Sequence, residues 1–386
     1  MSNRFRLSHR AALATVAAAG LTLAVPATAF ASTSHGQQKP HQPQGPRKDL
    51  ALHQVNLASD VPGMAPLTDP DLKNPWGVAM TPASPLWVSD QGADASTLYQ
   101  LNPDGHTVTK SAAVRVTMAG STLGPSGAVA NTGKGFVLSN GTTKAPAAFM
   151  FATLDGHIEA WSPTVDPHIG NTEDKATVAG AGFTGLALAS THAGDRLLAA
   201  DFNAPAGKID AFDSSFHQVK LAGWQFTDPH LPQAYHAFNV QELNGHIFVA
   251  YDTPDPVTMH EGIGVGIGIV DEYTNDGQLV ARVATGGTLN APWGLAIAPA
   301  SWGKDAGALL VGNFGDGKIS FFAKDGSHFA KKSTGQVTDA TTGKPFAEPG
   351  LWALLPGTPV NGGTNSVWFT AGINHEQNGL LGLLRP

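Results

Sequence analysis

The sequence predicts an all-β protein folded as a single six-bladed β-propeller, with four-stranded antiparallel blades closed by the N- and C-terminal strands. The first observation is a repeated phrase. NPWGVA at 74–79 returns as APWGLA at 291–296, and in weaker form as SGAVA, TGLALA and GLWALL. The second observation is that the same two further phrases follow each copy. Such self-similarity indicates a repeat architecture, because one repeat cannot bury its apolar face alone.

The third observation is a composition typical of turn-rich β-structure. The 386 residues include 45 Gly and 27 Pro, and only 14% are charged. The repeated phrases are short, rich in Val, Ile, Phe and Trp, and bounded by Gly, Pro, Asn and Asp. This pattern of short segments bounded by turn residues favours strands over the helices of a solenoid.

Each repeat supplies the strands of one blade. The NPWG-like phrase is predicted as the innermost strand. The second phrase is an apolar run ending in a small polar residue, as in LWVSD at 86–90 and LLVGN at 309–313. The third alternates apolar and polar residues, as in GHIEAW at 156–161 and GKISFF at 317–322. A polar return such as HTVTKSAAVRV at 106–116 completes a four-stranded unit.

The two ends of the predicted propeller are expected to close the ring together. Residues 52–59, LHQVNLAS, precede the first NPWG phrase and have no blade of their own. We expect them to form the outer strand of the last blade, beside a strand near residues 380–384. This closure leaves no open seam in the ring.

Two recurring residue types have a structural interpretation. The glycine after Trp76 and Trp293 lets the innermost strands approach closely, where a side chain would clash. An Asp or Asn ends most copies of the second phrase and is expected to cap the turn beyond it. These turn residues are Asp90, Asn140, Asp201, Asp252 and Asn313.

Residues 1–31 are predicted to be a secretory signal peptide. Three arginines precede an apolar run at residues 11–25, and the small-x-small motif AFA predicts cleavage near Ala31. The run is shorter than the roughly 20 residues that a membrane span needs. Residues 32–49 are predicted to be a disordered Pro/Gln-rich leader, and residues 50–386 the propeller. We therefore expect a secreted, extracellular protein without a membrane span.

Charge and cysteine content limit the partners and the chemistry. Removal of the three signal-peptide arginines leaves 20 basic and 30 acidic residues, which disfavours nucleic acid as a partner. The chain contains no cysteine, which excludes disulfides and thiol chemistry. We expect a monomer that meets an extracellular protein, peptide or glycan.

Several long phrases resemble those of a known protein family. They include NPWGVAMTPASPLWVSDQGADASTLYQLNPDG, DPHLPQAYHAFNVQELNGHIFVAY and VWFTAGINHEQNGLLG. They are similar to an uncharacterised family of secreted bacterial β-propellers, some of which carry PEP-CTERM sorting tails. The resemblance covers roughly residues 50–386 and implies a six-bladed, NHL-like or TolB-like propeller without an established activity. This sequence ends at Pro386 without a sorting tail, so we do not expect surface retention by that route.

Carboxylates and amides at a propeller mouth could hold one divalent cation, with calcium as the expected ion. Five metal-ligand candidates have suitable side chains: Glu376, Asn239, Asp201, Asp252 and Asp90. The three aspartates occupy the recurring turn position, so a capping role is the favoured interpretation for them. Glu376 and Asn239 lie where the repeat pattern is broken. Residue type without geometry is weak evidence for a site.

Three histidines, His236, His260 and His375, also lie where the repeat pattern is broken. They lack the spacing of a zinc site. The resemblance implies a more acidic loop where this chain has His260 and Glu261, which disfavours a metal there. His157 is expected to face solvent on its strand.

The innermost strands also carry candidate ligand-contact residues. The tryptophans recur in register, which favours packing between blades, although they could form an aromatic platform for a ligand. The ligand-contact candidates are Trp76, Trp293, Trp352, Asn74, Asn290, His236 and Asn239.

The segment GIGVGIGIV at 262–270 has a glycine at every second position from 262 to 268. It lacks the strand-to-helix context of a phosphate loop, so we do not predict a nucleotide site.

The sequence therefore predicts a secreted β-propeller that acts as a binding or interaction module, with no specific catalytic motif. The alternative is a metal-dependent hydrolase of the lactonase type, with a cation in the central channel. This alternative depends on analogy with other propellers. Convergence of Glu376, Asn239 and a turn aspartate in one channel mouth would favour it.

Overall fold

The computed structural model describes residues 50–166, 170–258 and 260–386. Strands dominate this part of the chain, with two one-turn 3-10 helices, η1 (Gln91–Ala93) and η2 (Gly303–Asp305). The predicted signal peptide and leader lie outside the described residues. No helix in the described ranges is long and apolar enough to cross a membrane. The all-β class predicted from the sequence is confirmed.

Four of the sheets have four antiparallel strands each, and each sheet is built mainly from consecutive strands. Listed from the inside outwards, the first is β3 (Pro75–Ala79), β4 (Leu86–Asp90), β5 (Ala95–Leu101) and β6 (Val108–Thr117), and the second is β7 (Pro125–Ala130), β10 (Phe149–Thr153), β11 (His157–Trp161) and β12 (Glu173–Thr177). The third is β13 (Phe183–Thr191), β14 (Gly194–Asp201), β15 (Ile209–Asp213) and β16 (Gln218–Val219), and the fourth is β17 (His236–Leu243), β18 (His246–Asp252), β19 (Ile269–Thr274) and β20 (Leu279–Thr285).

The remaining large sheet has nine strands. Its path runs β21 (Pro292–Ile297), β22 (Leu309–Asn313), β23 (Ile319–Phe322), β26 (Gly335–Asp339), β1 (Leu50–Ser59), β29 (Leu380–Arg385), β28 (Val367–Ala371) and β27 (Leu351–Pro356), with β2 (Leu67–Thr68) beside β1. Two small hairpins lie outside these sheets: β8 (Val137–Ser139) with β9 (Lys144–Pro146), and β24 (Lys324–Asp325) with β25 (His328–Phe329).

Strand β1 joins the two halves of the nine-stranded sheet. Its first residues pair in parallel with β26, from Leu50 opposite Val337. Its later residues pair antiparallel with β29, from His53 opposite Arg385 to Ser59 opposite Leu380. The predicted pairing of residues 52–59 with the C-terminal strand is therefore present, and it covers the edge that β29 would otherwise expose.

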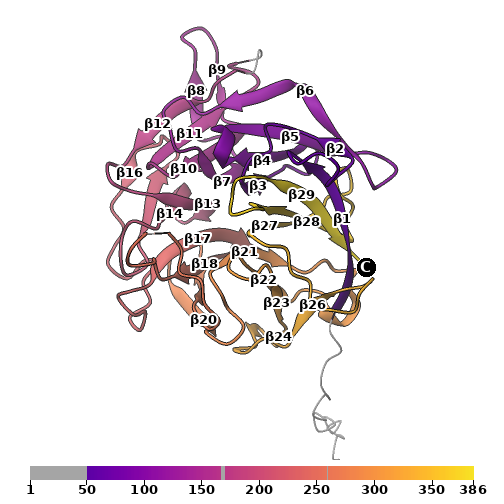
Figure 1. Cartoon of the computed structure of the whole chain (residues 1–386). Coiled ribbons are helices and arrows are strands. Elements are labelled where there is room, and N and C mark those ends of the chain that lie inside the picture. The colour runs from indigo at the N-terminus through magenta and orange to yellow at the C-terminus, as the bar shows by residue number, and fades with distance from the viewer. Residues whose placement is uncertain (1–49, 167–169, 259) are drawn as a thin grey trace, which may run out of the picture. The chain divides into compact units, whose positions relative to one another are not determined.

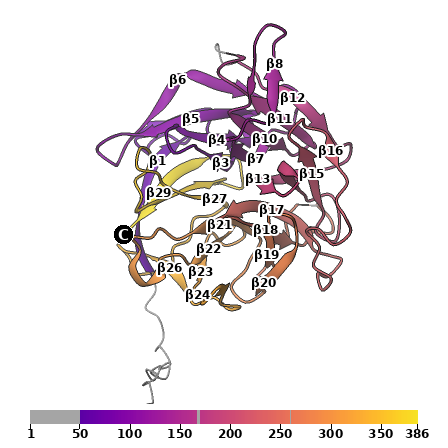
Figure 2. The ribbon, with the colours of Figure 1, turned by 180° about the vertical axis from the view of Figure 1, so that it is seen from behind.

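The first strands of successive sheets surround a common centre. Strands β3, β7, β13, β17, β21 and β27 contact one another in that order, and β27 also contacts β3. Figures 1 and 2 show these strands at the middle, with β6, β12, β20 and β26 further out. This is the arrangement of a β-propeller, in which the innermost strands line a channel.

Glycines allow the close approach of the innermost strands. A Cβ on Gly77 would lie 2.5 Å from the carbonyl oxygen of Ser126 in β7, and one on Gly127 would lie 2.5 Å from the backbone nitrogen of Leu186 in β13. Such contacts are too short for any side chain. The crowding inferred from the NPWG phrase is therefore present at these positions.

Apolar side chains fill the space between neighbouring sheets. Between the first two sheets, Trp87 of β4 stacks on Phe149 of β10 with ring centroids 4.3 Å apart, and Trp161 of β11 lies 4.8 Å from Trp87. Aromatic rings of this size dominate the apolar area buried in a core. The packing therefore holds each sheet against the next and fixes where the inner-strand ends meet.

Candidate functional site

The middle of the channel is filled by an aromatic cluster, which we define as Trp76, Phe238, Trp293 and Trp352. Trp76 and Trp352 stack with centroids 3.7 Å apart, and Trp293 packs edge-on against both at 6.1 and 5.7 Å. The three tryptophans are at most 4% exposed. The three rings therefore pack against one another from three different inner strands, β3, β21 and β27.

A cavity of about 230 Å³ lies above this cluster, at the end of the channel where the inner strands begin. We call it the mouth cavity. Aromatic rings and polar groups both contribute to its lining: Trp76, Phe202, Phe238, Leu154, Thr184, Gly182, Gln91, Asn203, His260, Glu261 and Glu376. The cavity is thus concave and partly apolar, with a few convergent polar groups, as ligand sites usually are.

Glu376 is presented by a strained turn after β28. Asn374, His375 and Glu376 have φ angles of 53°, 55° and 64°, so three consecutive non-glycine residues are left-handed. A left-handed backbone costs about 1–2 kcal/mol for most residues and less for Asn374, because asparagine tolerates this region. Hydrogen bonds to the Asp60 carboxylate, from the Asn378 side chain (2.8 Å) and the Gly379 N–H (2.8 Å), clamp the end of the turn. Backbone strain of this kind clusters at functional sites.

Asn74 orients the Glu376 side chain. The Nδ2 atom of Asn74 donates to Oε2 of Glu376 (2.9 Å) and to Oε1 of Gln91 (2.8 Å). Its Oδ1 atom accepts from the indole nitrogen of Trp352 (3.0 Å). A Cβ on Gly372 would lie 2.1 Å from Oδ1 of Asn74, so this glycine makes room for the amide. Asn74 is 4% exposed and is a positioning residue beneath the cavity surface.

The opposite wall comes from the loop between β18 and β19, which carries His260 and Glu261. The Gly262 N–H donates to Oδ2 of Asp252 (2.9 Å), and the Gly264 N–H donates to Oδ1 of Asn290 (2.8 Å). These two bonds pin the loop just beyond Glu261. Burial raises the pKa of Glu261, and the Glu376 carboxylate facing it raises that pKa further.

His260, Glu261 and Glu376 form one group of possible ligands. Each offers one ligand atom, and these atoms all lie within 4.8 Å of one another. One imidazole and two carboxylates suit a transition ion such as zinc or manganese better than calcium, which takes oxygen ligands. Of the five metal ligands expected from the sequence, this group contains only Glu376.

The turn aspartates do not join this group. Oδ1 of Asp201 accepts from the N–H groups of Gly182 and Asn203 (both 3.1 Å), and its Oδ2 pairs with Lys208 (3.0 Å). Asp90 accepts from the Thr97 hydroxyl at 2.6 Å.

Burial raises the pKa of two of these aspartates. It raises the pKa of Asp90 well above its usual value, and it raises that of Asp252 to about 7, with Glu261 nearby adding to the effect. All three aspartates are buried inside their own sheets.

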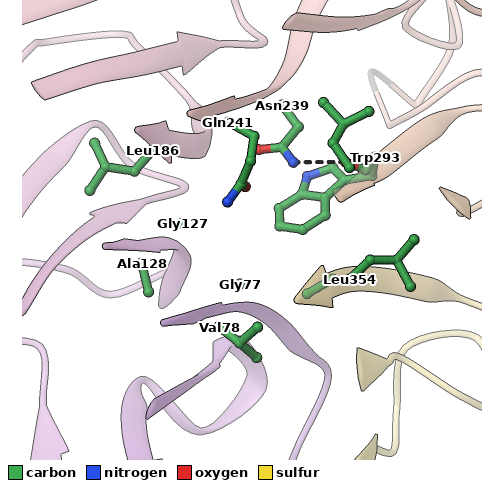
Figure 3. Close-up of a pocket in the computed structure, with 11 residues that line it drawn as sticks. Gly77, Val78, Gly127, Ala128, Leu186, Asn239, Gln241, Trp293 and Leu354 are labelled. Atoms are coloured by element: carbon green, nitrogen blue, oxygen red, sulfur yellow. Dashed lines mark hydrogen bonds between the residues drawn. The ribbon is translucent and has the colours of Figure 1, made fainter. Parts of the chain in front are cut away.

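Asn239 lies on the other side of the aromatic cluster. It stands where Gly77 and Gly127 stand in their strands, and its Nδ2 atom donates to the backbone oxygen of Trp293 (2.7 Å). Figure 3 shows this bond among the residues that line a narrow space under the cluster. The volume of that space is about 10 Å³. The amide therefore bridges β17 to β21 and does not meet Glu376 at the mouth.

Two further candidates have structural partners. Asn290 is 4% exposed and holds the β18–β19 loop through the Gly264 N–H. His236 is 8% exposed, and its Nδ1 atom lies 2.6 Å from the backbone oxygen of Phe202. Neither residue lines the mouth cavity.

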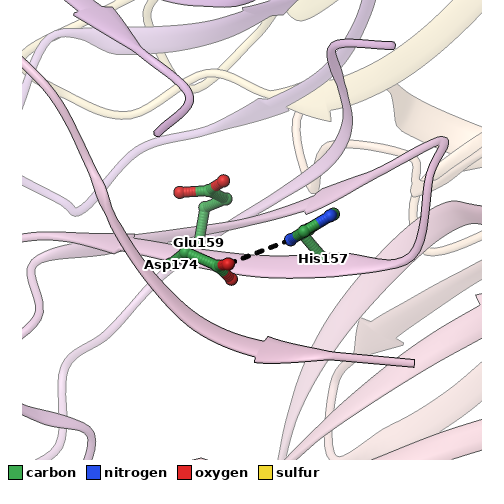
Figure 4. A group of neighbouring side chains, drawn as sticks. All are labelled: His157, Glu159 and Asp174. Carbon is green, nitrogen blue, oxygen red and sulfur yellow. Dashed lines mark hydrogen bonds and ion pairs between the residues drawn. The ribbon is translucent and has the colours of Figure 1, made fainter. Parts of the chain in front are cut away.

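A second group of possible ligands lies on the second sheet, at His157, Glu159 and Asp174. Figure 4 shows His157 paired with Asp174, their Nδ1 and Oδ2 atoms 3.1 Å apart, with the Glu159 carboxylate apart from them. Glu159 is fully buried and accepts from the Gly120 N–H (2.7 Å) and the Ala119 N–H (3.2 Å). Its carboxylate already has donors for both oxygens, so we assign this group a structural role.

The sequence reasoning missed several residues of the mouth cavity. Glu261 was placed in a loop that disfavours a metal, yet it faces Glu376. Gln91, Phe202 and Asn203 were not singled out. Their position in the sequence could have identified them. Gln91 directly follows β4, and Phe202 and Asn203 directly follow β14, so all three lie just beyond strands formed by the second repeated phrase.

No family model matches the chain. An uncharacterised protein of Acanthamoeba polyphaga mimivirus is 32% identical over 348 residues, which cover 88% of this chain and 82% of the viral protein. A second uncharacterised mimivirus protein is 30% identical over 350 residues, covering 89% and 88% of the two chains.

Solved structures similar to this chain include streptogramin B lyase, with 12% identity, a TM-score of 0.47 and coverage of 86% of this chain and 97% of that chain. A WD40 β-propeller domain has 8% identity, a TM-score of 0.41 and coverage of 80% and 92%. A putative gluconolactonase has 14% identity, a TM-score of 0.37 and coverage of 62% and 86%.

The sequence relatives are viral, whereas the resemblance implied a bacterial family. Identity of 30–32% extends over more than four-fifths of each chain. The protein therefore belongs to one family with these uncharacterised mimivirus proteins.

Proposed function

We propose that the protein is an exported six-bladed β-propeller similar to the secreted bacterial propellers that its sequence resembles. We further propose that it binds a small hydroxylated ligand, such as a glycan, in the mouth cavity. The blade count is supported by the nine-stranded sheet, which divides at β1 into β21-β22-β23-β26 and β27-β28-β29-β1. Export is supported by the signal-peptide pattern of residues 1–31.

The chemistry of the mouth cavity supports a hydroxylated ligand. Glu261 and Glu376 can accept hydrogen bonds from hydroxyl groups, and the rings of Trp76 and Phe238 offer an apolar face. The observation that carries the proposal is the convergence of the Glu261 and Glu376 carboxylates, whose oxygens lie within 4.8 Å of each other, on a cavity that is also lined by the Trp76 and Phe238 rings.

A glycan array followed by calorimetry tests the proposal. Glu376→Gln keeps an acceptor for Asn74 but removes the charge, and we expect it to weaken the binding of an array ligand at least tenfold. The matched control is Glu242→Gln, in the cavity at the other end of the channel, which should bind as the wild type does. An array without any ligand, or full binding by Glu376→Gln, would contradict the proposal.

A metal-dependent hydrolase of the lactonase type is the second candidate function. The group of His260, Glu261 and Glu376 favours it, because their ligand atoms lie within 4.8 Å of one another beside a cavity. These three side chains would hold the ion, and Asn74 would orient Glu376 from behind. When bound, such an ion would polarise a carbonyl group and activate water.

Thermal melting with zinc, manganese, calcium or EDTA tests this second candidate. We expect zinc or manganese to raise the melting temperature of the wild-type protein by several degrees, because an ion that binds only the folded state stabilises it. His260→Ala should abolish the rise, while His192→Ala, at an exposed histidine elsewhere, should not. Equal melting curves with each ion and with EDTA would exclude the metal site.

A further inference from the structure

A second, larger cavity adjoins the mouth cavity. We call it the side cavity; its volume is about 810 Å³. Glu376 lines both cavities, so this residue stands at the boundary between them. The β18–β19 loop also spans the boundary, since Glu261 lines the mouth cavity and Ile263 lines the side cavity. One ligand could therefore occupy both spaces.

Apolar side chains on the rim of the side cavity are exposed to water. Ile263 is 62% exposed and Met64 is 40% exposed. The loop that carries Ile263 is held in place, because the N–H groups of Gly262 and Gly264 on either side of this residue are hydrogen-bonded. Large apolar side chains fixed at the rim of a concave site favour contact with an apolar group of a ligand.

Stacked aromatic rings continue beneath both cavities. Trp76 lines the mouth cavity and stacks on Trp352 at 3.7 Å, and Trp352 packs against Phe314 at 4.2 Å. Phe314 lines the side cavity. Ile373, which is 5% exposed, extends this apolar floor. The floor is therefore apolar from one cavity to the other.

The nearby acids of the side cavity already have partners. Asp316 pairs with Lys318 at 3.1 Å, and Glu348 accepts from the Gln54 side chain at 2.7 Å. In the mouth cavity, by contrast, the Glu261 and Glu376 carboxylates converge, with oxygens within 4.8 Å of each other. The hydroxyl groups of a ligand would therefore find hydrogen-bond acceptors in the mouth cavity, and its apolar part would find contacts in the side cavity.

We propose that the ligand is amphipathic, with a hydroxylated head in the mouth cavity and an alkyl or aryl arm in the side cavity between Met64, Ile263 and Phe314. This inference rests on the proposed binding function and names the class of ligand. The two cavities contribute separately, so each can be tested without the other.

Two probes test the side cavity. N-phenyl-1-naphthylamine is an uncharged apolar fluorophore, and we expect it to bind the wild-type protein saturably. Ile263→Ser should weaken this binding at least fivefold. Val265→Ser is the matched control, since Val265 is 81% exposed on the same loop and lines neither cavity. Both variants change an exposed side chain, and circular dichroism checks that they fold.

Alkyl glucosides of increasing chain length, used below their micellar concentrations, form the second probe. We expect each added methylene to improve displacement of the fluorophore about fourfold over the first few carbons. A flat chain-length series, or equal binding by Ile263→Ser and Val265→Ser, would overturn the amphipathic ligand.

The two proposals fail in different ways. If Glu376→Gln loses an array ligand while the fluorophore still binds independently of Ile263, the mouth site stands and the apolar arm is wrong. If the fluorophore binding depends on Ile263 but no hydroxylated ligand depends on Glu376, the side cavity stands as an apolar site, and both the hydroxylated head and the amphipathic ligand are wrong.

Discussion

Substitution of Asn74 by alanine should destabilise the protein strongly, because one amide satisfies three neighbours. Removing Oδ1 leaves the indole N–H of fully buried Trp352 without its acceptor, which costs about 1–3 kcal/mol. Glu376 loses its donor at the edge of a cavity that water can reach, which costs about 0.5–1.5 kcal/mol. Residue 74 has a φ of 43°, which alanine tolerates less well than asparagine by about 0.5–1 kcal/mol.

These contributions give a loss of about 2–5 kcal/mol in the free energy of unfolding, or a fall of roughly 3–7 °C in melting temperature for a domain of this size. Urea denaturation of a double-mutant cycle isolates the contact with the indole. In the Trp352→Phe background the donor is already absent, so Asn74→Ala should cost about 1–3 kcal/mol less than it does in the wild type. A coupling below about 0.5 kcal/mol would refute the assigned role of Asn74.

Three further predictions concern the backbone and a partly buried acid, at Asp155, Gly127 and the turn that carries Glu376. Burial would raise the pKa of Asp155, but neighbouring hydroxyl and backbone donors lower it to about 2. Asp155→Asn should therefore cost about 1–2 kcal/mol at pH 7, a deficit that should shrink in urea melts as the pH falls from about 4 to about 2. Gly127→Ala would place a Cβ 2.5 Å from the Leu186 nitrogen and should cost more than 2 kcal/mol, whereas Gly223→Ala, which meets nothing within 4 Å, should be nearly neutral; equal melting would contradict the crowding argument. His375→Gly should raise the free energy of unfolding by about 0.5–1 kcal/mol, since relief of the left-handed strain exceeds the added chain entropy, and a loss of stability would show that the strain is absent.

Short sequence patterns within one repeat were enough to predict the strands and the close packing at the glycines of the innermost strands. A glycine that recurs after an aromatic residue implies crowding, and Gly77 shows the short contact that this requires. The pairing of residues 52–59 with β29 followed from counting strands per repeat. Such features are predictable because each is encoded within one repeat and then copied.

The candidate site was only partly predictable, because its residues come from loops that differ between repeats. A broken repeat pattern singled out Glu376 and His260, and the structure places both residues in the lining of the mouth cavity. The same signal also selected Asn239, which instead bridges two inner strands through the Trp293 backbone. Sequence shows where a repeat changes, but the end of the channel that a changed residue reaches depends on tertiary packing.

The aromatic cluster has a consequence for how a ligand exchanges. Trp293 and Trp352 are at most 3% exposed, and the space beneath the cluster at Asn239 holds only about 10 Å³. A ligand in the mouth cavity therefore rests on a closed floor and must enter and leave by the same end. The walls at that end are the strained turn that carries Glu376 and the pinned loop that carries Glu261. Affinity and residence time should consequently respond to changes in these two segments, whereas the opposite cavity near Gln241 can change without altering ligand exchange.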